Sequence, residues 1–216
     1  MPRNLEVLTD KELFIKTKRI AEFVRNAKIS IHYGFGENWC RSLGKSGDKK
    51  LYQICLAEPI VRHIQKYTAL QHELAHIVYR TPFSAVHRLI KDWDYYEIYF
   101  NIFNILEDER IESHLTRDYI AYKKRFERTL KALGEDMRKG KFKKLNPVDV
   151  LLAVRFYRDD LAEQSKDYKK YKDAIENVRQ TDKYGSLRVL LTIKYLIDEY
   201  VEIRKEKEKK LQEAEN

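Results

Sequence analysis

The chain is poor in the residues that interrupt helices or cross-link small proteins. It has 7 glycines, 4 prolines and 2 cysteines in 216 residues. So few glycines and prolines leave room for long helices, because these two residues are the strongest breaks in regular structure. Cys40 and Cys55 cannot build a disulfide framework, and they lack the C-x-x-C spacing of a zinc site. We therefore expect a mostly helical protein in a reducing compartment, the cytosol.

Long apolar runs are missing as well. No stretch approaches the ~20 apolar residues that cross a bilayer. Residues 1–20 also lack the apolar core of a secretory signal. We therefore expect neither a membrane span nor export. Hydrophobic residues still make up 43% of the chain and aromatic residues 12%, a composition that excludes a disordered protein and allows a buried core.

The positive charge is unevenly distributed. The net charge is +9, and residues 121–146 hold ten Lys or Arg against three acids, a balance of +7. A solvated helix and loop would account for this composition. The alternative is a contact surface for nucleic acid or an acidic partner. No base-stacking or nucleic-acid-binding motif accompanies the segment.

The spacing of apolar residues predicts an α+β fold that is mostly helical. Alternation at Ile29, Ile31 and Tyr33 and a turn signal at 44–48 predict a small antiparallel sheet of two or three strands within residues 28–57. Helical spacing predicts helices before and after this sheet in the sequence, at 11–27, 59–79, 93–120, 147–164, 167–180 and 185–216. Asn146 followed by Pro147 is a typical helix start. We expect one domain over residues 1–120 and a helical extension over 121–216.

The segment HELAH, residues 72–76, carries the strongest chemical signal. His72 and His76 are one helical turn apart and about 40° apart around the helix axis, so both imidazoles can reach one metal ion. Glu73 lies at the edge of that face, where it can reach a metal-bound water without binding the metal. Leu70, Leu74, Ile77 and Val78 form the opposite, core-facing side. The alternative is a pair of buried histidines with separate hydrogen-bond partners.

A zinc hydrolase site needs a third protein ligand. Pro82 stands where a third histidine would follow in the metzincin pattern, so that class is excluded. An acid from a downstream helix is the other common solution, and NILEDERIESH supplies candidates. Glu107 lies at the centre of a core-facing arc, where a carboxylate is costly unless it is paired or binds metal. We rank Glu107 first and Asp108 second; His87 is a further alternative.

Other side chains of this region could support the site. Asn104, Asp108 and His114 could orient a histidine N–H or the ligand carboxylate. An oxyanion donor is also expected, and the candidates are His114, Tyr79, Tyr95, Tyr119 and Arg110. The sequence does not choose among them.

The pair formed by HELAH and NILEDERIE resembles metallopeptidase domains found in phages and beside von Willebrand factor A modules. The N-x-x-E-D-x-R-I-E string is also similar to one in cobaltochelatase-type and nitric-oxide-reductase-activation proteins. The resemblance covers about residues 28–118. It implies a minimal, gluzincin-like zincin fold, with a small sheet packed on the HELAH helix. By matching position, it also implies zinc on His72, His76 and Glu107 or Asp108, with Glu73 as general base.

Zinc-dependent peptide hydrolysis is therefore the expected activity. The run KKLYQICLA, residues 49–57, is expected to be an edge strand on which an extended substrate pairs. Two alternatives stay open. One is a non-catalytic zinc-fold module, as a partner of an AAA or von Willebrand system or as a virion component. The other is a SprT-like protease acting on DNA-bound proteins, which the basic segment favours although the third-ligand spacing does not match.

Overall fold

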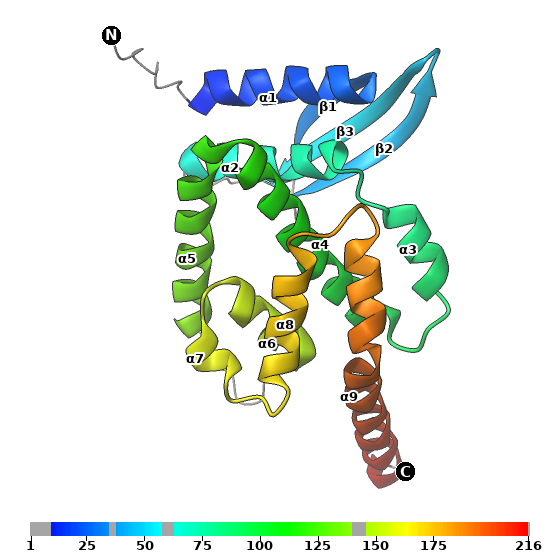
Figure 1. The fold of residues 1–216 in the computed structure, drawn as a ribbon. Coiled ribbons are helices and arrows are strands. Elements are labelled where there is room, and N and C mark those ends of the chain that lie inside the picture. Colours follow the sequence, from blue (N-terminus) through cyan, green and yellow to red (C-terminus); the bar gives the residue numbers. More distant parts are fainter. Residues whose placement is uncertain (1–9, 35–37, 58–62, 140–145, 216) are drawn as a thin grey trace. The chain divides into compact units, whose positions relative to one another are not determined.

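The computed structural model in Figure 1 describes residues 10–34, 38–57, 63–139 and 146–215. It confirms a mostly helical α+β fold with one small sheet. The chain divides into two compact units, residues 1–80 and 81–216. The helix that carries NILEDERIE belongs to the second unit, whereas the sequence grouped it with the N-terminal region. Across the described residues, no helix is both long and apolar enough to span a membrane.

The first unit holds a three-stranded sheet and two helices. The elements are α1 (Asp10–Arg25), β1 (Ala27–Gly34), β2 (Trp39–Ser46), β3 (Lys49–Ala57) and α2 (His63–Val78). The strand order is β1-β3-β2. Strands β2 and β3 form the expected antiparallel hairpin, whose turn uses Gly47 at φ 57°, a conformation that glycine adopts without strain.

Two expectations about this sheet were wrong. Strand β1 pairs with β3 in parallel, so the sheet is mixed rather than antiparallel. The KKLYQICLA strand, β3, is also central rather than an edge strand, because β3 lies between β1 and β2. A hairpin signal fixes only the pairing of two neighbouring strands. It does not say which of them a third strand joins, so the sequence left the strand order open.

The core of this unit joins the sheet to both helices. Ile29, Ile54 and Leu56 of the strands pack with Leu70, Leu74 and Ile77 of α2 and with Ala21 of α1, and all of them are buried. The apolar side of α2 is therefore the predicted one. It holds the HELAH turn against β3.

The second unit is helical. Its elements are α3 (Phe83–Ile90), α4 (Tyr96–Asp118), the 3-10 turn η1 (Ile120–Tyr122), α5 (Lys123–Lys139), α6 (Pro147–Arg155), α7 (Asp159–Ala162), α8 (Tyr168–Val178) and α9 (Gly185–Glu215). Helix α4 is the centre of this unit and packs against α3, α5, α6, α8 and α9. Residues Ile102, Phe103, Leu106 and Ile111 of α4 are fully buried.

Helix α6 begins where the sequence predicts and ends earlier. The Asn146 side chain accepts a hydrogen bond from the Asp149 N–H, the Asp149 carboxylate accepts one from the Asn146 N–H, and Pro147 occupies the first turn. The helix stops at Arg155, and Tyr157 then takes φ 59°. The expected single helix over 147–164 was therefore wrong, because neither glycine nor proline marks this break.

Candidate metal centre

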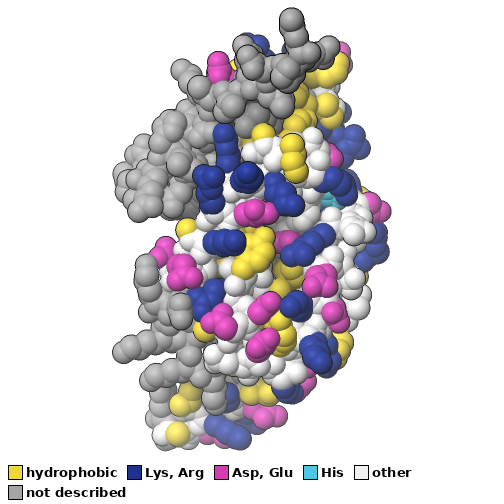
Figure 2. All heavy atoms as spheres, turned by 60° about the vertical axis from the view of Figure 1, so that its left-hand side comes forward, with side chains coloured by type: hydrophobic (Ala, Val, Ile, Leu, Met, Phe, Trp, Pro, Cys, Tyr) yellow, Lys and Arg dark blue, Asp and Glu magenta, His cyan; other side chains and the backbone are white. Residues whose placement is uncertain are grey.

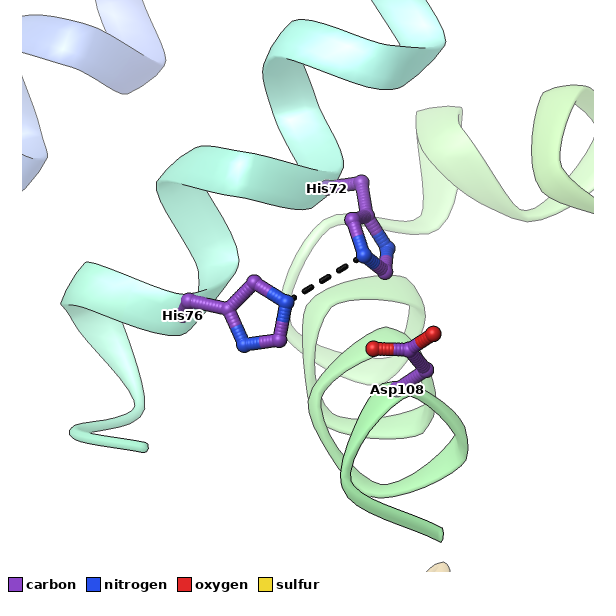
Figure 3. A group of neighbouring side chains, drawn as sticks. All are labelled: His72, His76 and Asp108. Atoms are coloured by element: carbon purple, nitrogen blue, oxygen red, sulfur yellow. Dashed lines mark hydrogen bonds between the residues drawn. The ribbon is translucent and has the colours of Figure 1, made fainter. Parts of the chain in front are cut away.

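The two histidines of HELAH lie on one turn of α2 (Figure 3). Their Nε2 atoms are 3.2 Å apart, and the ring planes are nearly perpendicular, at 89°. Two nitrogen ligands on one tetrahedral zinc, each at 2.0–2.1 Å, would be about 3.3 Å apart. The spacing of the nitrogens therefore matches that of two zinc ligands. A hydrogen bond between two neutral imidazoles has the same spacing.

Glu73 is held beside these histidines in a nearly closed environment, with 4% of its surface exposed. Its carboxylate lies close to Cys40 of β2. Burial raises the pKa of the Cys40 thiol, and the negative charge of Glu73 raises that pKa further. These two effects favour the neutral thiol of Cys40. Because Glu73 is largely shielded from solvent, its carboxylate can exchange a proton with a bound molecule without competition from bulk water.

Glu107 is fully buried in the second unit and already has partners. Arg110 donates hydrogen bonds from Nε, at 2.9 Å to Oε2, and from Nη2, at 2.6 Å to Oε1. The Ser186 hydroxyl of α9 donates a third, at 2.7 Å to Oε2. The prediction that a carboxylate at this position needs compensation is met by these protein groups.

Asp108 is more accessible than Glu107. Its side chain is 23% exposed, whereas that of Glu107 is fully buried. Arg155 of α6 lies beside it, with Nη1 3.8 Å from Oδ2, which is longer than a hydrogen bond. The carboxylate of Asp108 is thus open to solvent in part, as a ligand of a catalytic metal ion needs to be.

Arg155 is the functional neighbour that the sequence did not reveal. Besides Asp108, it approaches Glu109 at 3.7 Å and Glu112 at 2.8 Å. Burial opposes its charge, but the carboxylates of Glu112, Asp108 and Glu109 outweigh burial and raise its pKa. A single arginine in the apolar run LLAVRF was the available signal, because a buried cation requires acidic partners.

Glu109 shows how strongly this cluster is buried. It is 7% exposed and accepts a 2.7 Å hydrogen bond from Arg179 Nε. Burial raises the pKa of Glu109, and the opposing effects of Arg155 and Arg179 do not cancel it. The acidic side of α4 is therefore covered by arginines of other helices and is not a solvent-facing stripe.

Asn104 lies one turn before Asp108 on α4. Its Oδ1 atom is buried and has no hydrogen-bond partner among the described residues. A buried acceptor without a donor is uncommon and costly. The sequence predicts that Asn104 orients a histidine N–H or the ligand carboxylate, and Oδ1 is an acceptor of the kind that an N–H requires.

The remaining candidates have other contacts. The His114 Nε2 lies 2.8 Å from the Thr181 carbonyl oxygen, so Nε2 carries the proton, and Nδ1 contacts Arg117. Arg110 is bound to Glu107, and Tyr95 donates to Glu208. His87 is an exposed residue of α3. These contacts weaken the case for His114, Arg110 or Tyr95 as an oxyanion donor, and Tyr79 and Tyr119 stay candidates.

The first unit thus brings His72, His76 and Glu73 together, and the second brings Glu107 to Arg110 and Ser186, and Asp108 to Arg155. A histidine pair, a protected carboxylate and a partly accessible aspartate are the donor types of a hydrolytic zinc site. Comparisons of the chain with protein-family models, curated proteins and solved structures found no match.

Proposed function

We propose that the chain is a zinc-dependent metallopeptidase in which His72, His76 and Asp108 bind the metal and Glu73 is the general base. The observation that carries this proposal is the 3.2 Å separation of the two histidine Nε2 atoms on one turn of α2. It agrees with two ligands of one tetrahedral zinc ion, for which about 3.3 Å is expected.

The choice of Asp108 over Glu107 rests on the partners of each carboxylate. Glu107 accepts three hydrogen bonds from Arg110 and Ser186, and a metal bound to Glu107 would compete with these buried contacts. Asp108 is 23% exposed and lies 3.8 Å from Arg155, which also contacts Glu109 and Glu112. We therefore assign the metal to Asp108, the more accessible of the two carboxylates.

The donor set is suited to zinc. Two imidazoles and one carboxylate are a common protein ligand set for catalytic zinc, and they leave one position for water or substrate. In the proposed site, His72 and His76 of the first unit (Figure 3) supply the two imidazoles, and Asp108 of the second unit supplies the carboxylate. The buried Oδ1 of Asn104, one turn from Asp108, supplies an acceptor for a second contact.

The chemistry would follow from the residues around the metal. When bound, zinc lowers the pKa of a water molecule and polarises the carbonyl of the scissile bond. Glu73 accepts a proton from the attacking water and passes it to the leaving amine. Its low exposure keeps this proton from bulk water. An extended peptide would pair with an open edge of the sheet, β1 or β2, because β3 has a neighbour on each side.

The test combines metal analysis with a protease assay. Purified protein should contain about one zinc per chain, and His72→Ala, His76→Ala and Asp108→Ala should each lose it. Glu73→Gln should keep zinc and lose cleavage of fluorescently labelled casein by a factor of about 100 or more. His87→Ala is the matched control, because His87 is an exposed histidine outside the proposed ligand set.

Two results would count against the proposal in different ways. Protein without zinc under metal-replete conditions would exclude the metal site. Protein with zinc on these ligands, but with casein cleavage that Glu73→Gln does not change, would exclude Glu73 as the base. It would favour the non-catalytic zinc-fold module.

A further inference from the structure

The first half of α5 presents an unusual concentration of positive charge. Residues 123–131 hold five Lys or Arg and one acid, Glu127. Four of these cations are exposed, and around the helix axis they fall within about 140° of one another. We call them the α5 cation face: Lys123, Lys124, Arg128 and Lys131. Figure 2 turns the α5 side of the molecule forward and shows Lys and Arg side chains there, with acidic ones among them.

These four cations have no ion-pair partner within 4 Å in the described part of the chain. The last helix gives a contrast, because its surface cations are neutralised locally. In α9, Lys194 pairs with Asp198, Arg204 with Glu208, and Lys205 with Glu202. The described residues of the unit therefore do not neutralise the α5 cation face through ion pairs.

The placement of this charge opposes the stability of the helix. The amino-terminal end of a helix carries the positive end of its dipole, which favours acids there and disfavours cations. The first turn of α5 has no acid and begins with two lysines. Lys124 and Arg128 are also like charges four residues apart, a destabilising spacing. Both effects become favourable once an anion lies on the face, because the dipole and the side chains then attract it together.

Three other residues of α5 anchor the helix that carries the α5 cation face. Phe126 and Leu130 are buried next to the face, about 60° and about 20° around the helix axis from Lys123. Gly134 approaches the end of α6 so closely that a Cβ there would lie 2.4 Å from the Phe156 carbonyl oxygen. The helix that carries the cations is therefore anchored at Phe126, Leu130 and Gly134.

From these features we propose that the α5 cation face binds the phosphate backbone of double-stranded DNA without sequence preference. The face extends about 12 Å along the helix, at about 1.5 Å per residue. One DNA strand presents a phosphate about every 3.4 Å of its axis, so three to four phosphates meet four cations. This surface is independent of the proposed peptidase site.

The chemistry of the face favours a duplex over other polyanions. Single strands are held largely by stacking on exposed aromatic side chains. The only aromatic residue of α5 is Phe126, and it is buried. An acidic protein surface would usually add apolar contacts at its centre. Between these cations, Arg125, Glu127 and Thr129 are half-buried and Phe126 and Leu130 are buried, so the segment exposes no apolar side chain.

The experiment is a salt titration of binding, measured by fluorescence anisotropy of a labelled 20-base-pair duplex. The full chain should bind, with log Kd rising linearly with log salt concentration. Changing all four cations to glutamine should weaken binding at least about tenfold at about 50 mM salt. It should also reduce the salt slope by about 3 to 4, close to one per lost phosphate contact.

A charge-matched control separates a local surface from general attraction. Lys16, Arg19, Lys45 and Lys49 are exposed cations of the other unit, and their change to glutamine removes the same net charge. This control should retain most of the affinity and slope, and circular dichroism should show that both variants are folded. The proposal is overturned if the wild-type chain does not bind the duplex, or if both variants lose affinity equally. It is also overturned if polyglutamate or a single strand of equal length binds more tightly than the duplex.

Discussion

The Ser186 hydroxyl donates a 2.7 Å hydrogen bond to Glu107 Oε2 and thereby joins the start of α9 to the middle of α4, across 79 residues of sequence. Together with Arg110, it surrounds a fully buried carboxylate. Glu107 is therefore a structural residue by its contacts, although it is adjacent in sequence to the proposed ligand Asp108. The two neighbours should respond differently to substitution.

Glu107→Ala should lower the free energy of unfolding by about 3–5 kcal/mol, because Arg110 is left buried without its counter-charge. Asp108→Ala should cost about 1 kcal/mol, since its contact with Arg155 is long and partly exposed. Urea unfolding of metal-free protein measures both values. Zinc should be lost from Asp108→Ala and retained by the folded fraction of Glu107→Ala. The reverse pattern would restore Glu107 as the ligand.

Leu74→Ala should destabilise the first unit by about 2–5 kcal/mol, because Leu74 is completely buried between α2 and the sheet. Leu133 of α5 is 42% exposed, and Leu133→Ala should change stability by less than about 0.5 kcal/mol. Denaturant unfolding followed by circular dichroism compares the two. Equal effects would mean that the apolar side of α2 does not anchor the histidine turn.

Asn146→Ala should cost about 1 kcal/mol through loss of the reciprocal hydrogen bonds with Asp149 at the start of α6. Asn146→Asp keeps an acceptor at the same position and should recover most of this loss. Thermal unfolding of the two variants beside wild type provides the measurement. If aspartate is no better than alanine, the hydrogen bonds at this helix start contribute little.

Asp182 should make stability depend on pH in the acid range. Hydrogen bonds from Arg188 and from the Tyr184 N–H lower its pKa below the ordinary value of 3.8. Its contribution is therefore fully present above that ordinary value and is lost as the pH falls through the lower folded-state pKa. The stability difference between wild type and Asp182→Asn should shrink as the pH is lowered from 5 to about 2. Urea unfolding at a series of pH values tests this, and a difference that stays constant contradicts it.

Local features of the fold could be predicted from the sequence. The apolar spacing of Leu70, Leu74 and Ile77 predicts the orientation of α2, and Asn146–Pro147 predicts the start of α6, because both signals act within one or two turns. The parallel partner of β1 and the central position of β3 depend on strand order, which no local pattern encodes. The break at Tyr157 carries no glycine or proline to mark it.

The side-chain partners of the acids on α4 could likewise be predicted only in part from the sequence. The sequence identifies Glu107 as a carboxylate in need of compensation, but its partners include Ser186, far along the chain. Arg155 contacts three acids of α4 but lies on another helix, α6. Helix periodicity shows which side chains share a face, and only the packing shows which helix covers that face.

The central position of α4 in the second unit sets a lower limit on the length of a working fragment. A piece ending near residue 120 would contain every candidate metal ligand and would look complete from its motifs. It would lack α6, α8 and α9, which cover α4 and supply Arg155, Arg179 and Ser186. Glu109 and Glu112 would then lose the arginines that pair with them, and Glu107 would keep Arg110 but lose the Ser186 hydroxyl. The C-terminal half, which donates no ligand, is in this sense part of the site's scaffold.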